Sequence, residues 1–294
     1  MKNLKKYYLL TISSLLFLSC TKDDDQKILD SSTSSNNVTL VFENTFKKTP
    51  IVLGEPTSAT VTTNISVNNQ KHFFKEIKYV VSNIRFVKED GTEVPYNVSN
   101  LDLGATVIDQ SKPETLNYVL SAIPYGNYKQ IKFGLGVQSN LNKVDQTKFP
   151  IFFANAGENK TQMMWEWGAG YRFVKIEGYY GDTNDNLSIH TGSTEKKDPN
   201  KNFVQGVNAY RDIILNLPIQ AIVGKMSPKI TINADFDKLL SGTDKITLIT
   251  NDRGDNNATP NIHSAVQMMR FVNNIGGNGT TDVMGMFSAT KVQN

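Results

Sequence analysis

Apolar and polar residues alternate along much of the chain from Val38 onward. Four segments show the alternation clearly, at residues 38–42, 131–137, 213–219 and 230–236. A period of two places every second side chain on the same face of an extended strand. Each segment therefore predicts a β-strand with one buried face and one wetter face.

Turn residues separate these strands. Asp90-Gly91 and Ser241-Gly242 are typical of tight turns. The sequence shows no regular alternation of strands with long helical patterns, which would indicate parallel βαβ units. The pattern predicts a mainly β protein, an antiparallel β-sandwich with long loops. We expect those loops where Asn and Gly are abundant, at residues 138–162, 181–203 and 251–258.

One short helix is predicted near the C-terminus. Thr259 is a suitable N-cap residue, and Pro260 suits the first helical position. Apolar residues then recur at helical spacing, and Gly276 can end the helix. A shorter helical turn is expected over residues 236–240.

Residues 1–19 have the features of a bacterial export signal. Three lysines precede an apolar stretch that is too short to span a membrane as a mature helix. The stretch ends in Phe17-Leu18-Ser19-Cys20, which resembles the lipobox of bacterial lipoproteins, with Phe17 in place of the usual Leu. We expect acylation of Cys20. An ordinary secretory peptide with a buried cysteine is the alternative.

Residues 20–37 are expected to form a lipidated, disordered tether. They are rich in Ser, Thr, Asn and Asp and cannot bury a core. The Lys and three Asp residues soon after Cys20 resemble the export tag of Bacteroidota-type lipoproteins. This resemblance implies the outer face of the outer membrane, and the periplasmic face is the alternative. No low-complexity linker divides residues 38–294, so we expect a single domain there.

The charge of the chain argues against a nucleic-acid-binding protein. It has 31 basic and 28 acidic residues, and three of the lysines lie in the predicted signal peptide. The mature chain therefore carries no net charge, whereas nucleic-acid binding depends mostly on an excess of Lys and Arg. The single cysteine also excludes an internal disulfide.

Motifs that indicate catalysis are absent from the sequence. It contains no phosphate-binding glycine loop, no G-x-S-x-G and no HExxH. Asp182-x-Asn184-x-Asn186 begins like a calcium loop but lacks the Gly and the Glu that such a loop requires. We therefore expect a protein that is not an enzyme.

The most informative stretch is residues 163–178, MMWEWGAGYRFVKIEG, which contains both tryptophans of the chain. On one continuous strand, Trp165, Trp167, Tyr171 and Phe173 would share a face. A bend or bulge at Gly168 and Gly170 is the alternative. Such a row most often belongs to a core. A wall beside a metal site and a sugar-stacking platform are the two functional alternatives.

This stretch resembles the Met-x-Trp-x-Trp signature of the methanobactin-associated copper-binding (MbnP-like) family. Three further blocks resemble the family in the same order, at residues 78–86, residues 123–137 and His190-x-Gly192. The resemblance covers about residues 38–290. It implies a secreted or surface β-sandwich that binds copper.

In members of the family imidazoles bind the metal, and a tryptophan beside it can be oxidised to kynurenine. The resemblance therefore implies His190 and His263 as copper ligands, and Trp165 or Trp167 as the oxidised or wall residue. His72 has no motif support and is expected on an edge strand or at the surface. Imidazole suits copper and thioether suits Cu(I). Two histidines leave the coordination of the ion incomplete, so a methionine, a main-chain oxygen, a modified tryptophan or water has to complete the site.

Two functions are consistent with these features. The first is an outer-membrane-anchored lipoprotein that binds copper through histidines and captures or hands over the ion without catalysis. The second is a surface adhesion or glycan-binding β-sandwich module without metal. Tryptophans on a solvent-facing platform would favour sugar binding, and tryptophans packed beside His190 would favour a metal.

Overall fold

The computed structural model describes residues 36–157, 163–165, 170–197, 203–249, 257–258, 261–262, 265–278 and 285–294. The chain divides into two units, Met1–Thr33 and Ser34–Asn294, and all described residues belong to the second. The predicted signal peptide and Cys20 lie outside the described residues. No helix in the described part of the chain is both long enough and apolar enough to cross a membrane.

The larger of the two main sheets in the described part of the chain contains ten strands, and its central path is antiparallel throughout. In order, the path consists of β11 (Phe203–Asn208), β10 (Asp185–Lys197), β9 (Arg172–Tyr180), β4 (Lys71–Lys88), β8 (Gly126–Leu135) and β12 (Arg211–Val223). Four short strands extend it. One pairs with β10, namely β16 (Asn261–Ile262), and three pair with β4, namely β3 (Asn64–Ile65), β5 (Glu93–Tyr96) and β6 (Thr106–Asp109).

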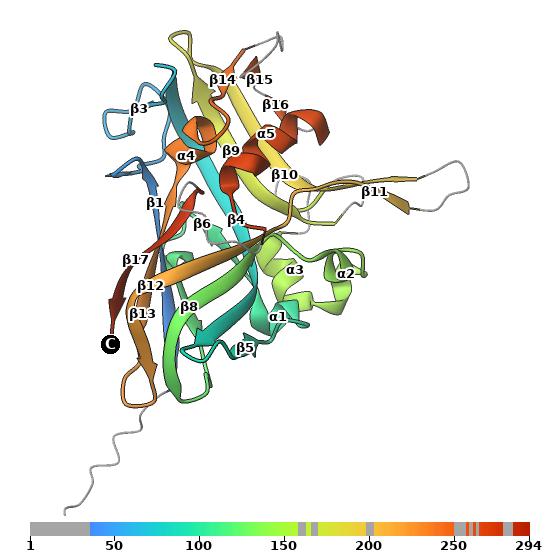
Figure 1. Ribbon diagram of the computed structural model, residues 1–294. Helices are drawn as coiled ribbons and strands as arrows, with labels where there is room; N and C mark the ends of the chain where they lie inside the picture. The colour runs from blue at the N-terminus through green and yellow to red at the C-terminus, as the bar shows by residue number, and fades with distance from the viewer. Residues whose placement is uncertain are drawn as a thin grey trace, which may run out of the picture. The chain divides into compact units, whose positions relative to one another are not determined.

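The smaller sheet contains five strands (Figure 1). Its order is β17 (Phe287–Gln293), β13 (Lys229–Asp235), β1 (Val38–Phe46) and β2 (Thr49–Pro50), with β7 (Asn117–Leu120) also paired to β1. β1 and β13 run parallel, with Phe42 opposite Ile232. This pair differs from the expected antiparallel arrangement. Parallel pairing requires a long connection between the two strands. Here the chain between β1 and β13 forms the strands of the larger sheet before it returns to the smaller one.

An aromatic core joins the two sheets. Phe42 of β1 lies edge-on to Tyr79 of β4 and to Phe133 of β8, with ring centroids 6.0 and 6.4 Å apart. Phe287 of β17 makes the same kind of contact with Phe133 at 5.3 Å. All four rings are buried, and edge-to-face packing suits the charge distribution of aromatic rings. The predicted mainly β sandwich is confirmed.

The strand predictions were accurate, whereas each of the three predicted loops contains regular structure, with β15 (Asn257–Ala258) inside residues 251–258. The segments at 38–42, 131–137, 213–219 and 230–236 lie in or overlap β1, β8, β12 and β13. Residues 181–203 contain the whole of β10, since Leu187, Ile189 and Thr191 bury one side of an extended chain. Residues 138–162 contain α2 (Ser139–Asn142), a 3-10 turn and α3 (Pro150–Ala156).

Both predicted helices are present, one of them shortened. In α4 (Phe236–Ser241), the Asp235 carboxylate caps the helix by accepting the N–H of Asp237. α5 (Ala265–Ile275) starts later than expected, because Asn261 and Ile262 instead pair with β10. Backbone pairing at a strand edge here outweighs the local helical pattern.

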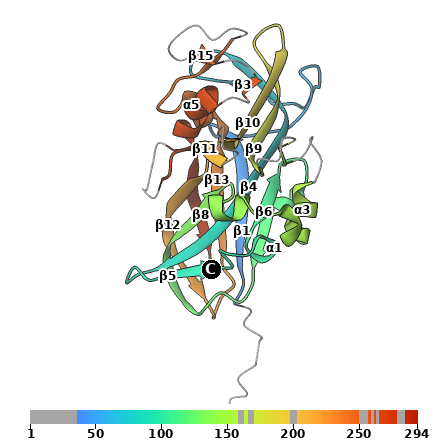
Figure 2. The ribbon, with the colours of Figure 1, turned by 90° about the vertical axis from the view of Figure 1, so that its right-hand side faces the viewer.

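The remaining short elements lie at the ends of the larger strands. They are α1 (Leu101–Gly104), the 3-10 helix η1 (Pro113–Leu116) and the parallel pair β14 (Thr247–Leu248) and β15 (Asn257–Ala258). In both views, α5 and β15 lie at the end of the domain opposite the C-terminus (Figures 1 and 2). α5 packs against β10, the strand that contains His190 and pairs with β9.

Candidate metal centre

His190 is a buried residue of β10 whose ring is held by a carboxylate. Its side chain is 6% exposed, and its Nε2 lies 2.5 Å from Oε1 of Glu177 on the neighbouring strand β9. Because an ionised carboxylate only accepts hydrogen bonds, Nε2 carries the proton in this contact. Ser188 also donates to the same carboxylate oxygen, at 3.2 Å. The contacts fix both the tautomer and the orientation of the imidazole.

Glu177 stays ionised at neutral pH despite its partial burial. Burial acts to raise the pKa of its carboxyl, but the hydrogen bond and charge of His190, with smaller contributions from Ser188 and Lys175, outweigh it. The pKa of Glu177 is therefore below its usual value. The stability that this pair contributes is present above the ordinary carboxyl pKa, and it is lost as the pH falls through the lowered value.

Trp165 packs beside His190. The side chain is 4% exposed, and the centroids of the two rings are 6.0 Å apart. The guanidinium of Arg172 lies 5.0 Å from the centre of the Trp165 ring, within the range of a cation–π contact. Trp165 is thus a buried wall of the His190 site. Trp167 lies outside the described residues.

The tryptophan segment turns back on itself and does not form the expected continuous strand. The N–H of Trp165 donates to the carbonyl of Gly170 at 3.0 Å, and Met164 pairs antiparallel with Tyr171. Gly170 has φ +86°, a conformation that favours glycine. Trp165 and Tyr171 therefore belong to opposite arms of a hairpin, and the expectation of one shared face was wrong. The sequence allowed for a bend or bulge here at Gly168 and Gly170.

Gly192 explains the glycine of the His-x-Gly block. A Cβ at this position would lie 2.5 Å from Nε1 of Trp165, so only glycine lets the indole approach β10. The N–H of Gly192 donates to the thioether of Met268, a buried residue of α5, at 3.4 Å. The block therefore brings an imidazole, an indole and a thioether to one stretch of β10.

The C-terminal segment reaches the same stretch through β16. In the parallel pairing of β16 with β10, Ile262 lies opposite Ile189. The next residue on β10 is His190, and the next residue after Ile262 is His263. His263 itself lies outside the described residues. Within the described part of the chain, no group of three or more His, Cys, Asp and Glu side chains could hold a metal.

A sequence model of the MbnP family matches residues 35–264. The chain belongs to the MbnP family. The solved structure of MbnP from Methylosinus trichosporium has a similar fold, with a TM-score of 0.53 and 14% sequence identity. The similarity covers 88% of this chain and 98% of that protein. No curated protein sequence matches the chain.

The matched region includes every block on which the family resemblance was based. It contains Trp165, His190 and Gly192, and it ends one residue after His263. The expected family membership is therefore confirmed, as is the mainly β fold. The identities of the site residues remain predictions, because the family match assigns no role to individual side chains.

A row of charged residues that the sequence reading missed crosses the sheet from His190. In register, His190 lies opposite Lys175 of β9, Lys175 opposite Lys78 of β4, and Lys78 opposite Asp109 of β6. The carboxylate of Glu76 lies 2.7 Å from the Lys175 ammonium and 2.8 Å from that of Lys78. A lysine as buried as Lys175 needs such a partner. The sequence signal for this row was the presence of charged residues two positions apart within largely buried strands, at Glu76 and Lys78 and at Lys175 and Glu177.

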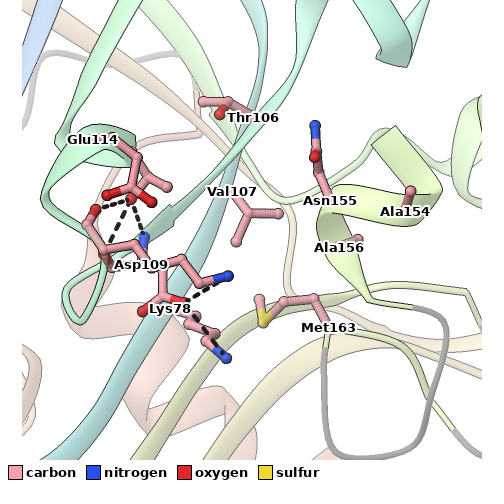
Figure 3. A pocket seen from close by; sticks show the side chains of 11 residues that line it. Lys78, Thr106, Val107, Asp109, Glu114, Ala154, Asn155, Ala156 and Met163 are labelled. Atoms are coloured by element: carbon pink, nitrogen blue, oxygen red, sulfur yellow. Dashed lines mark hydrogen bonds and ion pairs between the residues drawn. The ribbon is translucent and has the colours of Figure 1, made fainter. Parts of the chain in front are cut away.

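The charged row ends at a polar pocket of about 340 Å³ (Figure 3). Lys78 and Asp109 lie on one side of this pocket, and the end of α3 lies on the other. Met163 also lines it, two residues before Trp165. Neither His190 nor Trp165 is among its described lining residues, so the predicted site residues gather at the opposite end of the row.

His72 was expected at an edge strand or the surface, and this expectation was wrong. It lies on the central strand β4, opposite Tyr180 of β9, and is 0% exposed. Its ring stacks against Phe46, and neither ring nitrogen has a hydrogen-bond partner among the described residues. Burial lowers the pKa of His72 to about 4, so the ring is neutral at physiological pH.

Proposed function

We propose that this MbnP family member is an outer-membrane lipoprotein that binds a copper ion as cargo at His190 and captures it or hands it over without transforming it. The observation that carries the proposal is the buried imidazole of His190, oriented by Glu177 and walled by Trp165. Family membership supports copper as the ion. The ion is cargo in this proposal, not a resident cofactor.

The donor set fits copper. A metal-binding histidine commonly donates its other ring N–H to a carboxylate, which fixes the ring and raises its basicity. Glu177 engages Nε2 in this way, so Nδ1 is the nitrogen that we assign to the ion. The thioether of Met268 in α5 accepts the N–H of Gly192, two residues beyond His190 on β10, and imidazole with thioether is a suitable combination for Cu(I).

We propose His263 as the second imidazole. Support comes from β16, which pairs the residue before His263 with the residue before His190. A second imidazole from this position would complete a site built from segments that are distant in sequence.

Titration with Cu(I) and Cu(II) tests the copper site. We expect His190→Ala and His263→Ala each to weaken binding at least tenfold, because each removes a ligand. The third histidine provides the matched control: His72→Phe removes an imidazole from the core and should leave the affinity unchanged. Equal affinities for wild type and both ligand variants would contradict the proposal.

The buried tryptophan does not support the glycan-binding alternative. A sugar platform needs an aromatic face that is open to solvent, and Trp165 is 4% exposed. Its position beside His190 is the arrangement that favours a metal. Trp165 therefore enters the proposal as a wall of the copper site and not as a binding platform.

The lipid anchor is a separate part of the proposal, supported by the sequence around Cys20. Metabolic labelling with a fatty acid should mark the wild-type chain and fail to mark Cys20→Ser. Protease treatment of intact cells then distinguishes the two faces of the outer membrane. Digestion supports the outer face, and protection until the cells are opened supports the periplasmic face.

A further inference from the structure

Two exposed large apolar side chains lie on neighbouring turns at one end of the domain. Tyr125, just before β8, is 65% exposed, and Met226, between β12 and β13, is 44% exposed. The Tyr125 ring packs over Gly224, where an added Cβ would lie 2.7 Å from the ring. Pro124, Tyr125 and Met226 are all exposed, and we call these three residues the apolar tip.

The chain enters the domain beside the apolar tip. Ile123, next to Pro124, donates its N–H to the carbonyl of Asn36 at 2.9 Å and accepts from the Asn36 side chain at 3.1 Å. Thr39 donates to the carbonyl of Pro228, in the turn that carries Met226, at 3.0 Å. Figure 1 shows the beginnings of β1 and β8 at the same lower end as the turn between β12 and β13.

The side chains of this end suit the boundary between lipid headgroups and acyl chains. Tyrosine has an apolar ring with a polar tip and is enriched at that boundary, and lysines can extend their ammonium groups into the headgroup layer. Lys225 and Lys229 are exposed in and after the turn that carries Met226. Glu89, engaged by Gln220, and Asp90 are the acidic residues of the turn that follows Lys88.

We infer that the apolar tip rests on the surface of the membrane that holds the acylated Cys20. The inference depends on the proposed lipid anchor. Only fifteen residues separate Cys20 from Asn36, and a tether of this length keeps the domain at a high effective concentration near the lipid. A patch that is too small to bind a membrane alone is then sufficient to hold the domain in one orientation.

This orientation would hold the copper site away from the lipid. Lys88 of β4 lies beside Gly126 at the tip, and Lys78 of the same strand lies in the charged row with His190. Ten residues of strand separate the two lysines, which corresponds to roughly 33 Å. The site would therefore face the medium and exchange its ion with a partner outside the membrane.

Fluorescence quenching in vesicles tests the inference on the full lipidated protein. Because acylation consumes Cys20, a substituted cysteine is the only reactive thiol for a dye. Ser227→Cys places the dye next to the apolar tip, and Asp182→Cys places it in the exposed turn between β9 and β10 as the matched control. The vesicles contain phosphatidylcholine, some phosphatidylglycerol and a lipid with a nitroxide on its headgroup.

We expect severalfold stronger quenching at position 227 than at position 182. Adding Tyr125→Ser and Met226→Ser to the labelled Ser227→Cys protein should abolish the difference. Equal quenching at both positions on vesicle-bound protein would overturn the inference and leave the lipid anchor standing. Failure of the protein to associate with the vesicles at all would overturn the anchor and, with it, this inference.

Discussion

His190 combines burial with a fixed ring orientation, and both properties matter for binding an ion. A buried imidazole keeps competing water away, and the contact with Glu177 holds one tautomer. Trp165 and Gly192 restrict the space around it, because the glycine lets the indole lie against β10. Each of these residues therefore has an effect that can be measured separately.

Replacing Glu177 by glutamine tests its positioning role. Gln can still accept a hydrogen bond from His190 but lacks the charge that raises the basicity of the ring. We expect a 10–100-fold loss of copper affinity, the usual range for residues that support a metal-binding histidine. Calorimetric titration checks it, with Glu55→Gln at an exposed ion pair as the control. A dissociation constant equal to that of the wild type would contradict the role.

Because His72 is buried as a neutral ring, we expect the protein to lose stability in acid. The pKa of His72 is about 4 in the folded protein and 6.5 ordinarily, so the unfolded chain binds the extra proton first. The free energy of unfolding is therefore unaffected by protonation of His72 above pH 6.5. It decreases as the pH falls toward 4, by up to about 3 kcal/mol. Urea unfolding at several pH values measures this loss.

The variant His72→Phe isolates that contribution. Neither nitrogen of His72 has a partner in the described structure, so an apolar ring should preserve stability at neutral pH. We expect the variant to lose less stability than the wild type between pH 6.5 and 4. Parallel pH profiles for the two proteins would show that the buried imidazole does not titrate as described.

At the scale of elements, β10 organises the candidate site. β9 supplies Glu177 on one side of it, β16 pairs on the other, and α5 contributes Met268. The hairpin that begins at Met163 supplies Trp165. Four separate segments thus meet along a few residues of one strand, which makes the packing between segments a property that can be tested.

Gly192→Ala tests the packing of the hairpin on β10. The added Cβ would lie 2.5 Å from the Trp165 indole, so the ring has to move, at an expected cost of about 1–3 kcal/mol in the free energy of unfolding. Tryptophan fluorescence should shift as the indole is displaced. Gly54→Ala is the control, since its Cβ would come no closer than 3.3 Å to a neighbour. Unchanged unfolding and fluorescence of Gly192→Ala would contradict the contact.

The sequence revealed elements whose signals are local. Alternation located β1 and β13 because each buries one face, and the short helical turn expected over residues 236–240 is present as α4. The pairing that begins at Met163 joins residues close in sequence, and Gly168 and Gly170 marked a possible bend there. The sequence could not reveal β16, whose conformation depends on pairing with β10, a partner distant in sequence. For the same reason the motif indicated His190, whereas Glu177 and the buried His72 became recognisable only with the neighbouring strands in place.

At the scale of the whole molecule, the sandwich brings together donors that no short motif contains. His190 and Met268 are separated by 78 positions, and His263 lies between them. A mutation that loosens the packing of the sheets should therefore weaken copper binding without touching a ligand. The apolar tip at the other end of β4 would give the same sandwich a fixed orientation on the membrane.

Anomalous diffraction at the copper edge, from crystals grown with copper, tests the central claim most directly. We predict a peak about 2 Å from Nδ1 of His190, the bond length usual for an imidazole nitrogen and a metal of this size. The peak should lie on the side of the ring away from Glu177, and His190→Ala crystals should lack it. A peak elsewhere, or no peak at His190 in fully loaded protein, would contradict the assignment.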